Sequence, residues 1–189
     1  MTVKDIAIVA ASILQADDVL EFLEQYGANE QDEPPKPEGD VKTLVACVNL
    51  ALAESAADTP VLHTATAVAR NGYIALDDEV FDGELASVRA VTFGGKNARF
   101  KFDSRGINVD RDGEYGVVYT VVQPDKGLTD EPEVGAGLDK TVLAYLSARD
   151  YCLVTGRTDE ASVWDQRYNA ELEKNRLLRR ARLPRRRFS

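Results

Sequence analysis

The residues that come closest to a catalytic or phosphate-binding motif are Gly94-Gly95-Lys96 and His63, the only histidine of the chain. A P-loop needs a further glycine upstream and a Ser or Thr directly after the lysine, and this sequence has neither. A hairpin turn explains the two glycines better. Spacing ties no Ser or Cys to His63, which argues against a catalytic triad or a metal cluster. We therefore predict no enzyme active site, no cofactor and no metal ion.

Acidic pairs and two cysteines are the other side chains that could take part in catalysis or bind a metal ion. Asp17-Asp18 and Asp77-Asp78 stand among turn residues, so we interpret them as solvated. A hydrolase with unrecognised carboxylates stays open as an alternative, since nothing singles out one acid pair. Cys47 and Cys152 lie on separate apolar helix faces without C-x-x-C spacing. Buried thiols are favoured over a disulfide or a metal ligand.

The charge of this 189-residue chain is divided unevenly. The net charge is −9, but residues 174–189 contain seven Arg, one Lys and no acid. That leaves 15 basic and 32 acidic residues, a net charge of −17, in residues 1–173. So acidic a body repels nucleic acid, whose binding depends on positive charge. No run approaches the length of a membrane span. The acids around the apolar N-terminal patch argue against a secretory signal, so we expect synthesis in the cytoplasm.

The last third of the sequence predicts a helical hairpin. One apolar face repeats at three- and four-residue steps, through Leu138, Val142, Tyr145, Leu146 and Cys152. Thr155-Gly156 ends this first helix, because glycine accepts the left-handed conformation that helix ends often need. Thr158 or Asp159 then caps a second helix. Its apolar stripe consists of Ala161, Trp164, Tyr168 and Leu172.

The N-terminal third predicts three helices. Thr2 and Asp5 resemble a capping box ahead of a helix over Ile6–Ile13, and a second short helix follows over Val19–Tyr26. Residues 28–39 hold three prolines and four acids, and they predict an exposed loop. Asp40 is predicted to cap a strong third helix. Its apolar stripe consists of Val41, Leu44, Val48 and Leu52.

From Val61 to Gln123 the apolar period changes to two, which predicts strands. Asn71-Gly72 is the strongest hairpin signal, and Gly94-Gly95 and Asp112-Gly113 are two further turns. The predicted strands are six, at 64–68, 73–76, 88–93, 98–102, 107–109 and 115–122. A polar turn segment is expected at 77–83, and a second loop at 124–137. The strands predict a small antiparallel sandwich or barrel-like unit.

The order of helices, strands and helices predicts an α+β fold with segregated elements, because no βαβ alternation supports a parallel sheet. We expect one helical bundle formed by both ends of the chain, with the β unit inserted. The predicted divisions are 1–60 for the N-terminal helices, 61–124 for the β insertion, 125–178 for the C-terminal helices and 179–189 for an extended basic tail. The predicted structural core consists of Leu44, Val48, Leu52, Tyr145, Cys152, Trp164 and Tyr168.

The basic tail has three interpretations. It is a solvated terminus, a nucleic-acid contact through Arg–phosphate pairing, or a segment that docks on another protein. Apolar residues interleave with the arginines, as in interface segments, and Pro184 stops the helix. Docking is therefore favoured. The candidate partner-binding residues are Arg179, Arg180, Arg182, Leu183, Arg185, Arg186, Arg187 and Phe188.

At these residues the chain resembles a known family. The segment VLAYLSARDYCLVTGRTDEASVWDQRY, residues 142–168, looks like the closing helices of head-to-tail adaptor proteins of tailed bacteriophages. In that family an A-x-x-Y-C-L-x-x-G stretch precedes an A-x-x-W-x-x-R-Y stretch and a basic tail. VKTLVACVNLALAE, residues 41–54, is similar to the early helix of the family, and FGGKNARFKF and GEYGVVYTVVQP fit its β insertion. The matching residues are Ala148, Tyr151, Cys152, Leu153, Gly156, Ala161, Trp164, Arg167 and Tyr168.

The resemblance implies a non-catalytic protein of the virion neck. Such adaptors form a ring, here twelve-fold, beneath the portal protein, with their C-terminal segments extended along the portal. Downstream tail or neck proteins attach below, and genomic DNA passes through the centre. An acidic body suits a channel that must not hold DNA, and an Arg–Leu–Phe tail suits a segment that becomes ordered on docking. The alternative from another class is a small nucleic-acid-binding protein that uses its Arg-rich tail.

Overall fold

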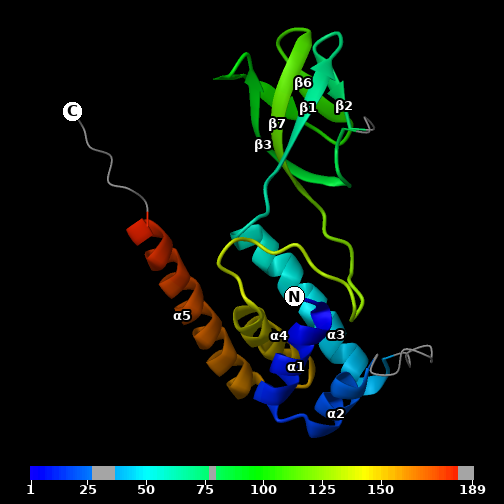
Figure 1. Cartoon of the computed structure of the whole chain (residues 1–189), viewed down its shortest axis with the longest axis vertical. Coiled ribbons are helices and arrows are strands. Elements are labelled where there is room, and N and C mark those ends of the chain that lie inside the picture. The colour runs from blue at the N-terminus through cyan, green and yellow to red at the C-terminus, as the bar shows by residue number, and fades with distance from the viewer. Residues whose placement is uncertain (27–36, 77–79, 183–189) are drawn as a thin grey trace. The chain divides into compact units, whose positions relative to one another are not determined.

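The computed structural model describes residues 1–26, 37–76 and 80–182, which form a mixed α+β protein with five helices and two antiparallel sheets. The chain divides into two compact units (Figure 1). The helical unit comprises residues Met1–Thr59 and Asp125–Ser189, and the β unit comprises Pro60–Pro124. Each unit is described by itself below. Among the described residues, none of the helices combines the length and apolar character that a membrane crossing requires.

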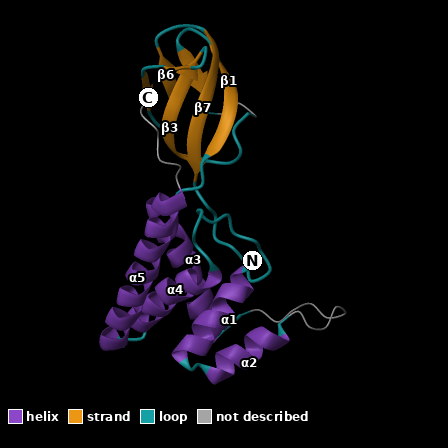
Figure 2. Cartoon of the chain, turned by 60° about the vertical axis from the view of Figure 1, so that its left-hand side comes forward, coloured by secondary structure: helices purple, strands orange, loops and turns teal. Residues whose placement is uncertain are grey.

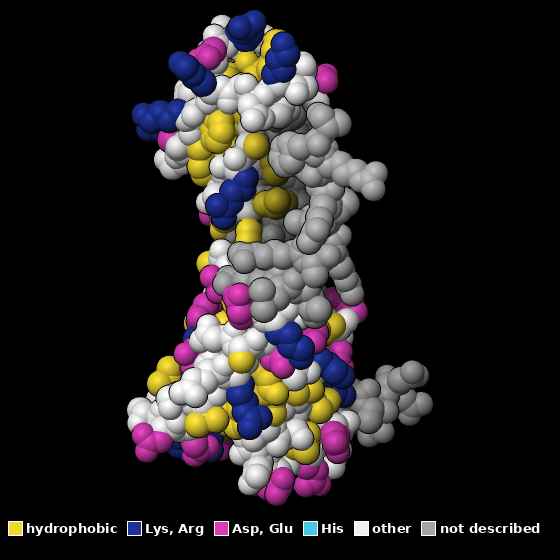
Figure 3. Space-filling view, turned by 90° about the vertical axis from the view of Figure 1, so that its left-hand side faces the viewer, with side chains coloured by type: hydrophobic (Ala, Val, Ile, Leu, Met, Phe, Trp, Pro, Cys, Tyr) yellow, Lys and Arg dark blue, Asp and Glu magenta, His cyan; other side chains and the backbone are white. Residues whose placement is uncertain are grey.

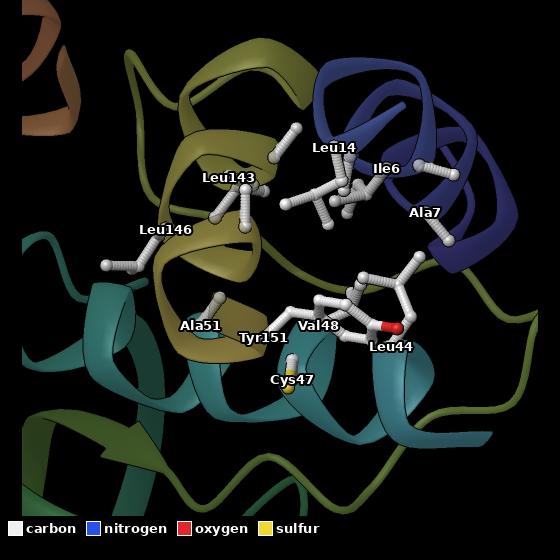
Figure 4. Close-up of a cluster of buried hydrophobic side chains, with 14 of the residues drawn as sticks. Ile6, Ala7, Leu14, Leu44, Cys47, Val48, Ala51, Leu143, Leu146 and Tyr151 are labelled. Carbon is white, nitrogen blue, oxygen red and sulfur yellow. The ribbon is translucent and has the colours of Figure 1, made fainter. Parts of the chain in front are cut away.

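Helix α4 is the centre of the helical unit. The helices are α1 (Val3–Leu14), α2 (Asp17–Gln25), α3 (Gly39–Asp58), α4 (Lys140–Val154) and α5 (Thr158–Arg182). α1, α3 and α5 each pack on α4, and α2 packs mainly on α1. Figure 4 shows side chains of α1, α3 and α4 converging on one buried cluster. This convergence explains why α4 has buried residues almost all round its circumference, whereas α2 buries only Val19 and Leu23.

The capping box predicted at the start of α1 is confirmed. The Thr2 backbone N–H donates to Asp5 Oδ2 at 2.8 Å, and the Asp5 backbone N–H donates to Thr2 Oγ1 at 3.2 Å. These two bonds satisfy N–H groups that have no partner within the helix. α1 therefore starts at Val3, three residues before the apolar run that predicted it.

The cap predicted for α3 is wrong. The N-cap residue is Glu38, whose side chain makes no capping hydrogen bond, and Asp40 lies within the first helical turn. Gly39 begins the helix at φ +51°. An acid in the first turn still interacts favourably with the positive end of the helix dipole, so Asp40 favours this helix without capping it. Residues 28–36 of the predicted loop at 28–39 lie outside the described residues.

The predicted break between α4 and α5 is confirmed at Thr155-Gly156. Gly156 has φ +78°, its N–H donates to the Leu153 carbonyl, and the Arg157 N–H donates to the Cys152 carbonyl at 2.7 Å. This pair of bonds is the Schellman arrangement, in which a left-handed residue lets the chain close over the last helical carbonyls. α5 begins at Thr158 with Asp159 and Glu160 in its first turn. The two helices therefore reverse direction and pack along each other (Figure 2).

The connection after the β unit contains no helix or strand from Val122 to Asp139, as predicted for a loop, but it is fixed to the helices. The Asn49 side chain exchanges hydrogen bonds with the backbone of Lys126, at 2.9 and 3.1 Å. The Val3 and Lys4 N–H groups donate to the carbonyls of Asp130 and Leu128. Leu128 is buried in the helical core. This segment therefore packs against α1 and α3 as part of the helical unit.

The β unit has two open sheets that share one core. The strands are β1 (His63–Ala69), β2 (Tyr73–Ala75), β3 (Leu85–Phe93), β4 (Lys96–Asn97), β5 (Phe100–Phe102), β6 (Gly106–Val109) and β7 (Gly113–Val121). One sheet has the order β1-β7-β3-β4 and the other β2-β6-β5, and the described strands do not close into a barrel. Ile74 and Ile107 from one sheet and Tyr115 and Tyr119 from the other are fully buried in the same cluster.

The predicted turns are present, but they do not all join paired strands. Asn71 and Gly72 have positive φ and form the expected tight turn, yet β1 and β2 pair only through Arg70 and Tyr73 before entering different sheets. Gly94-Gly95 leads into the two-residue strand β4, which was not predicted and pairs with β3. Within the predicted strand at 98–102, only residues 100–102 form a strand, and they pair with β6 in the other sheet. A turn signal marks a reversal of the chain, but only the core determines which sheet receives the next strand.

Candidate functional site

The seven residues predicted as structural core all lie at or against one cluster. Leu44, Val48, Leu52, Cys152 and Tyr168 are buried in it, and Tyr145 and Trp164 are partly buried beside it. The Tyr145 and Trp164 rings stack at 6.0 Å between centroids, across α4 and α5. These residues therefore position helices.

Both cysteines are free and buried, as predicted. Desolvation raises the pKa of the Cys47 thiol to about 11, with Asp150 and Cys152 adding to the effect. Desolvation also raises the pKa of Cys152. A nucleophilic cysteine needs a lowered pKa, so both thiols behave as small apolar side chains.

An ion-pair network centred on Arg149 joins three helices and was not predicted from the sequence. The Arg149 guanidinium on α4 donates to Glu54 of α3 at 3.0 Å, to its neighbour Asp150 at 2.6 Å, and to Asp165 of α5 at 3.4 Å. The bonds from Arg149 lower the pKa of Glu54, whereas desolvation raises the pKa of Asp150. The network holds α3, α4 and α5 in register. No sequence signal could have revealed it, because Glu54 lies 95 residues before Arg149 and meets it only through the packing of α3 on α4.

An apolar groove lies next to this network on the helical unit. Leu50 of α3 and Leu153 and Val154 of α4 are 56%, 53% and 64% exposed. With Ala53, Glu54 and Asp150 they line a shallow groove of about 450 Å³. Exposed apolar side chains that cluster in this way are typical of surfaces that contact another molecule.

A basic pocket of about 490 Å³ lies in the β unit. It lies where the β3–β4 hairpin meets the β6–β7 turn, and its charged lining is Lys96, Arg99, Arg111 and Asp110. Figure 3 shows Lys and Arg side chains gathered at one end of this unit. The remaining lining residues are Phe93, Asn97, Ala98 and Tyr115. The excess positive charge is unlike the acidic composition of the chain, and it suits an anionic ligand.

The residues considered for chemistry in the sequence come from separate elements of the structure. His63 lies on β1 with its ring 5.6 Å from that of Tyr119. Asp17 and Asp18 are exposed in the first turn of α2, rather than in a loop. Asp77 and Asp78 lie outside the described residues. No three His, Cys, Asp or Glu side chains in the described parts of the chain are placed to hold a metal ion.

The predicted partner-binding residues are only partly within the structure. Arg179, Arg180 and Arg182 stand on the last turns of α5, so the predicted boundary of an extended tail at residue 179 is wrong. Leu and Arg are strong helix formers, which explains why the helix continues through them. The other predicted residues, Leu183, Arg185, Arg186, Arg187 and Phe188, lie outside the described residues.

No protein-family model matches the chain, and no curated protein is significantly similar to it.

Proposed function

We propose that this chain is a structural head-to-tail adaptor of a tailed bacteriophage. In this proposal the helices from both ends of the chain form a bundle that carries an inserted β-sandwich. Twelve copies form a ring in the virion neck, docked beneath the portal protein. Tail or neck proteins attach below the ring, and genomic DNA passes through its centre. The protein performs no catalysis.

The observation that carries the proposal is the course of α5. Leu172 is the last residue that α5 buries among its described side chains, and the Asn175 side chain still donates to the Gly137 carbonyl at 2.7 Å. The helix then continues to Arg182 through a segment with no acid. A helix that delivers an Arg-, Leu- and Phe-containing end to a partner suits docking on a portal, because apolar side chains supply the anchors of a docked segment.

The residues of the family resemblance also occupy consistent structural positions. Ala148, Cys152, Ala161 and Tyr168 are buried where α4 packs on α5, and Gly156 forms the left-handed turn between the two helices. Because these residues specify one helical hairpin, their spacing supports the comparison with the closing helices of adaptors. The acidic body supports it as well, since a channel lined by like charge does not retain DNA.

Electron microscopy of the purified protein, alone and with the portal protein of the same phage, tests the proposal. We expect a largely monomeric protein at moderate salt and a ring on the portal, because like-charged bodies repel until the portal acts as a template. Higher salt should ease self-association. Absence of any complex with the portal would contradict the adaptor function.

The second candidate is a small nucleic-acid-binding protein. The observation that favours it is the run of Lys and Arg residues from Lys174 to Arg182 on α5. Binding of DNA by the full chain, with a steep salt dependence that becomes shallower when Arg179, Arg180 and Arg182 are replaced by Gln, would favour this candidate over the adaptor.

A further inference from the structure

The basic pocket of the β unit brings together two turns that are distant in the sequence. Phe93 ends β3, Lys96 and Asn97 form β4, and Arg99 follows them. Arg111 comes from the turn between β6 and β7. The pocket therefore exists only because the β3–β4 hairpin and the β6–β7 turn meet.

Aromatic packing fixes this meeting point. The Phe93 and Tyr115 rings lie 4.9 Å apart, and the buried Tyr115 hydroxyl donates to the Arg111 carbonyl at 2.9 Å. A Cβ atom at Gly113 would come within 2.7 Å of the Phe93 ring, so glycine is needed for the turn to approach this closely. The turn that carries Arg111 is thus held in place by its neighbours.

The cations of the pocket are available to a ligand. The Arg111 guanidinium stacks over the Phe93 ring at 5.5 Å, which orients it and leaves its N–H edge for an anion. Among the described residues, Lys96, Arg99 and Arg111 take part in no ion pair. All three side chains are exposed. Three cations and one acid, Asp110, around one concavity favour a bound anion.

We propose that this pocket binds the phosphate groups of nucleic acid, with Lys96, Arg99 and Arg111 contacting phosphate oxygens. Arginine donates in a planar fork that matches phosphate, and Asn97 adds an amide donor at the rim. A concave site of this volume accepts a charged group that is carried on a narrow, flexible chain. The phosphodiester groups of a single-stranded nucleic acid are carried on such a chain. A folded acidic protein carries its carboxylates on a broad surface, and such a surface enters a concavity of this volume less easily. This local site goes beyond the adaptor function proposed above, whose argument from acidic charge concerns the chain as a whole.

The test is the binding of a fluorescently labelled single-stranded oligonucleotide of about 20 nucleotides to the full-length chain at about 50 mM salt. The variant Lys96→Ala/Arg99→Ala/Arg111→Ala should bind at least about tenfold more weakly, with a salt dependence of log K that is shallower by about 2. The matched control is Arg89→Ala/Lys101→Ala/Arg105→Ala. It removes the same charge from exposed positions of the same unit outside the pocket, and its affinity should stay within about twofold of the wild type.

A second variant guards against an effect on folding. Lys96→Ala/Arg99→Ala keeps Arg111 on the Phe93 ring, and it should lose affinity while its far-ultraviolet circular dichroism stays unchanged. Equal binding by the pocket variants and the wild type would overturn the proposal and assign nucleic-acid binding to the tail. Unchanged oligonucleotide binding with loss of self-association in light scattering would overturn it in favour of an acidic surface on a second copy. An equal loss in the control variant would overturn it too, because it would show non-specific charge attraction.

Discussion

The Trp164 ring of α5 lies almost parallel to the Tyr145 ring of α4, with 10° between the ring planes and 6.0 Å between their centroids. The Arg167 guanidinium lies 5.1 Å from the centroid of the same Trp164 ring. Trp164 is only partly buried, although it is the largest apolar side chain of the stripe that predicted α5. It therefore covers the edge of the α4–α5 contact and does not fill the centre of the core.

Substitution of Trp164 by Ala tests this placement. We expect a loss of about 2 kcal/mol in the free energy of unfolding, below the roughly 3–5 kcal/mol typical of a fully buried aromatic residue. Trp164 is the only tryptophan, so the variant has no tryptophan fluorescence with which to follow unfolding. The helical circular dichroism signal during urea denaturation is therefore the suitable measurement. Val163→Ala is the control, since Val163 is 46% exposed on the same helix, and it should change stability by less than about 0.5 kcal/mol. Equal stabilities of the two variants would contradict the packing role of Trp164.

The capping box at α1 predicts a dependence on pH. The hydrogen bond from the Thr2 backbone N–H lowers the pKa of Asp5 below its usual value near 3.8. A lowered carboxyl pKa contributes stability that is present above the unfolded-state pKa and is lost as the pH falls through the folded-state pKa. Asp5→Ala should therefore cost about 1 kcal/mol at neutral pH, and the difference from wild type should shrink below about pH 4.

Urea denaturation of Asp5→Ala and wild type at a series of pH values between 7 and 3 measures this difference. Ser12→Ala is the control, because Ser12 is exposed on the same helix and does not titrate. A cost for Asp5→Ala that stays constant over the whole series would show that the ionised carboxylate does not stabilise the helix.

The Arg149 network predicts a larger effect, whose cost also shrinks at low pH but for a different reason. Arg149→Ala leaves the carboxylate of Asp150, which is 8% exposed, without its counterion. The expected cost is about 2–3 kcal/mol, at or below the low end for buried pairs, because Glu54 and Asp165 remain nearly half exposed. Desolvation already raises the pKa of Asp150, so in this variant lowering the pH should recover stability as the carboxylate takes up a proton.

The double variant Arg149→Ala/Asp150→Asn separates charge from packing. It should recover part of the lost stability at neutral pH, because the uncompensated buried charge is gone, and its stability should vary less with pH than that of Arg149→Ala. If thermal denaturation shows no recovery, the cost arises from the lost links to Glu54 and Asp165 and not from Asp150.

The sequence predicted those features that depend on neighbours in the chain. Thr2 with Asp5, and Thr155 with Gly156, set a helix start and a helix end through contacts within a few residues, and both were located correctly. The cap of α3 was misplaced by two residues, because Glu38 and Asp40 are both acids and only the backbone angles distinguish their roles. Local chemistry thus locates an element without fixing its exact boundary.

Features that depend on distant parts of the chain could not be predicted. Arg149 meets Glu54 only once α3 packs on α4. The basic pocket needs the turn after Phe93 and the turn at Arg111 to come together, and each turn alone resembles an ordinary polar turn. A pattern of alternating residues places strands, but it does not reveal their partners. β4 pairs with β3, whereas β5, which follows it closely in the chain, pairs with β6 in the other sheet.

The last prediction concerns the C-terminal segment. Removal of residues 183–189 leaves every described contact of α5 in place, including the bond from Asn175 to Gly137, so the unfolding temperature should not change. If the segment docks on the portal, the same deletion should abolish co-sedimentation with the portal protein.

Two full-length variants then separate the contributions of apolar contact and charge to this attachment. Leu183→Ala/Phe188→Ala removes the apolar anchors, and Arg185→Gln/Arg186→Gln/Arg187→Gln removes the charge. Apolar anchors supply most of the affinity in a docked segment, so the first variant should weaken attachment more, and high salt should affect only the wild type and the first variant. Attachment that survives the deletion undiminished would mean that the segment is a solvated terminus.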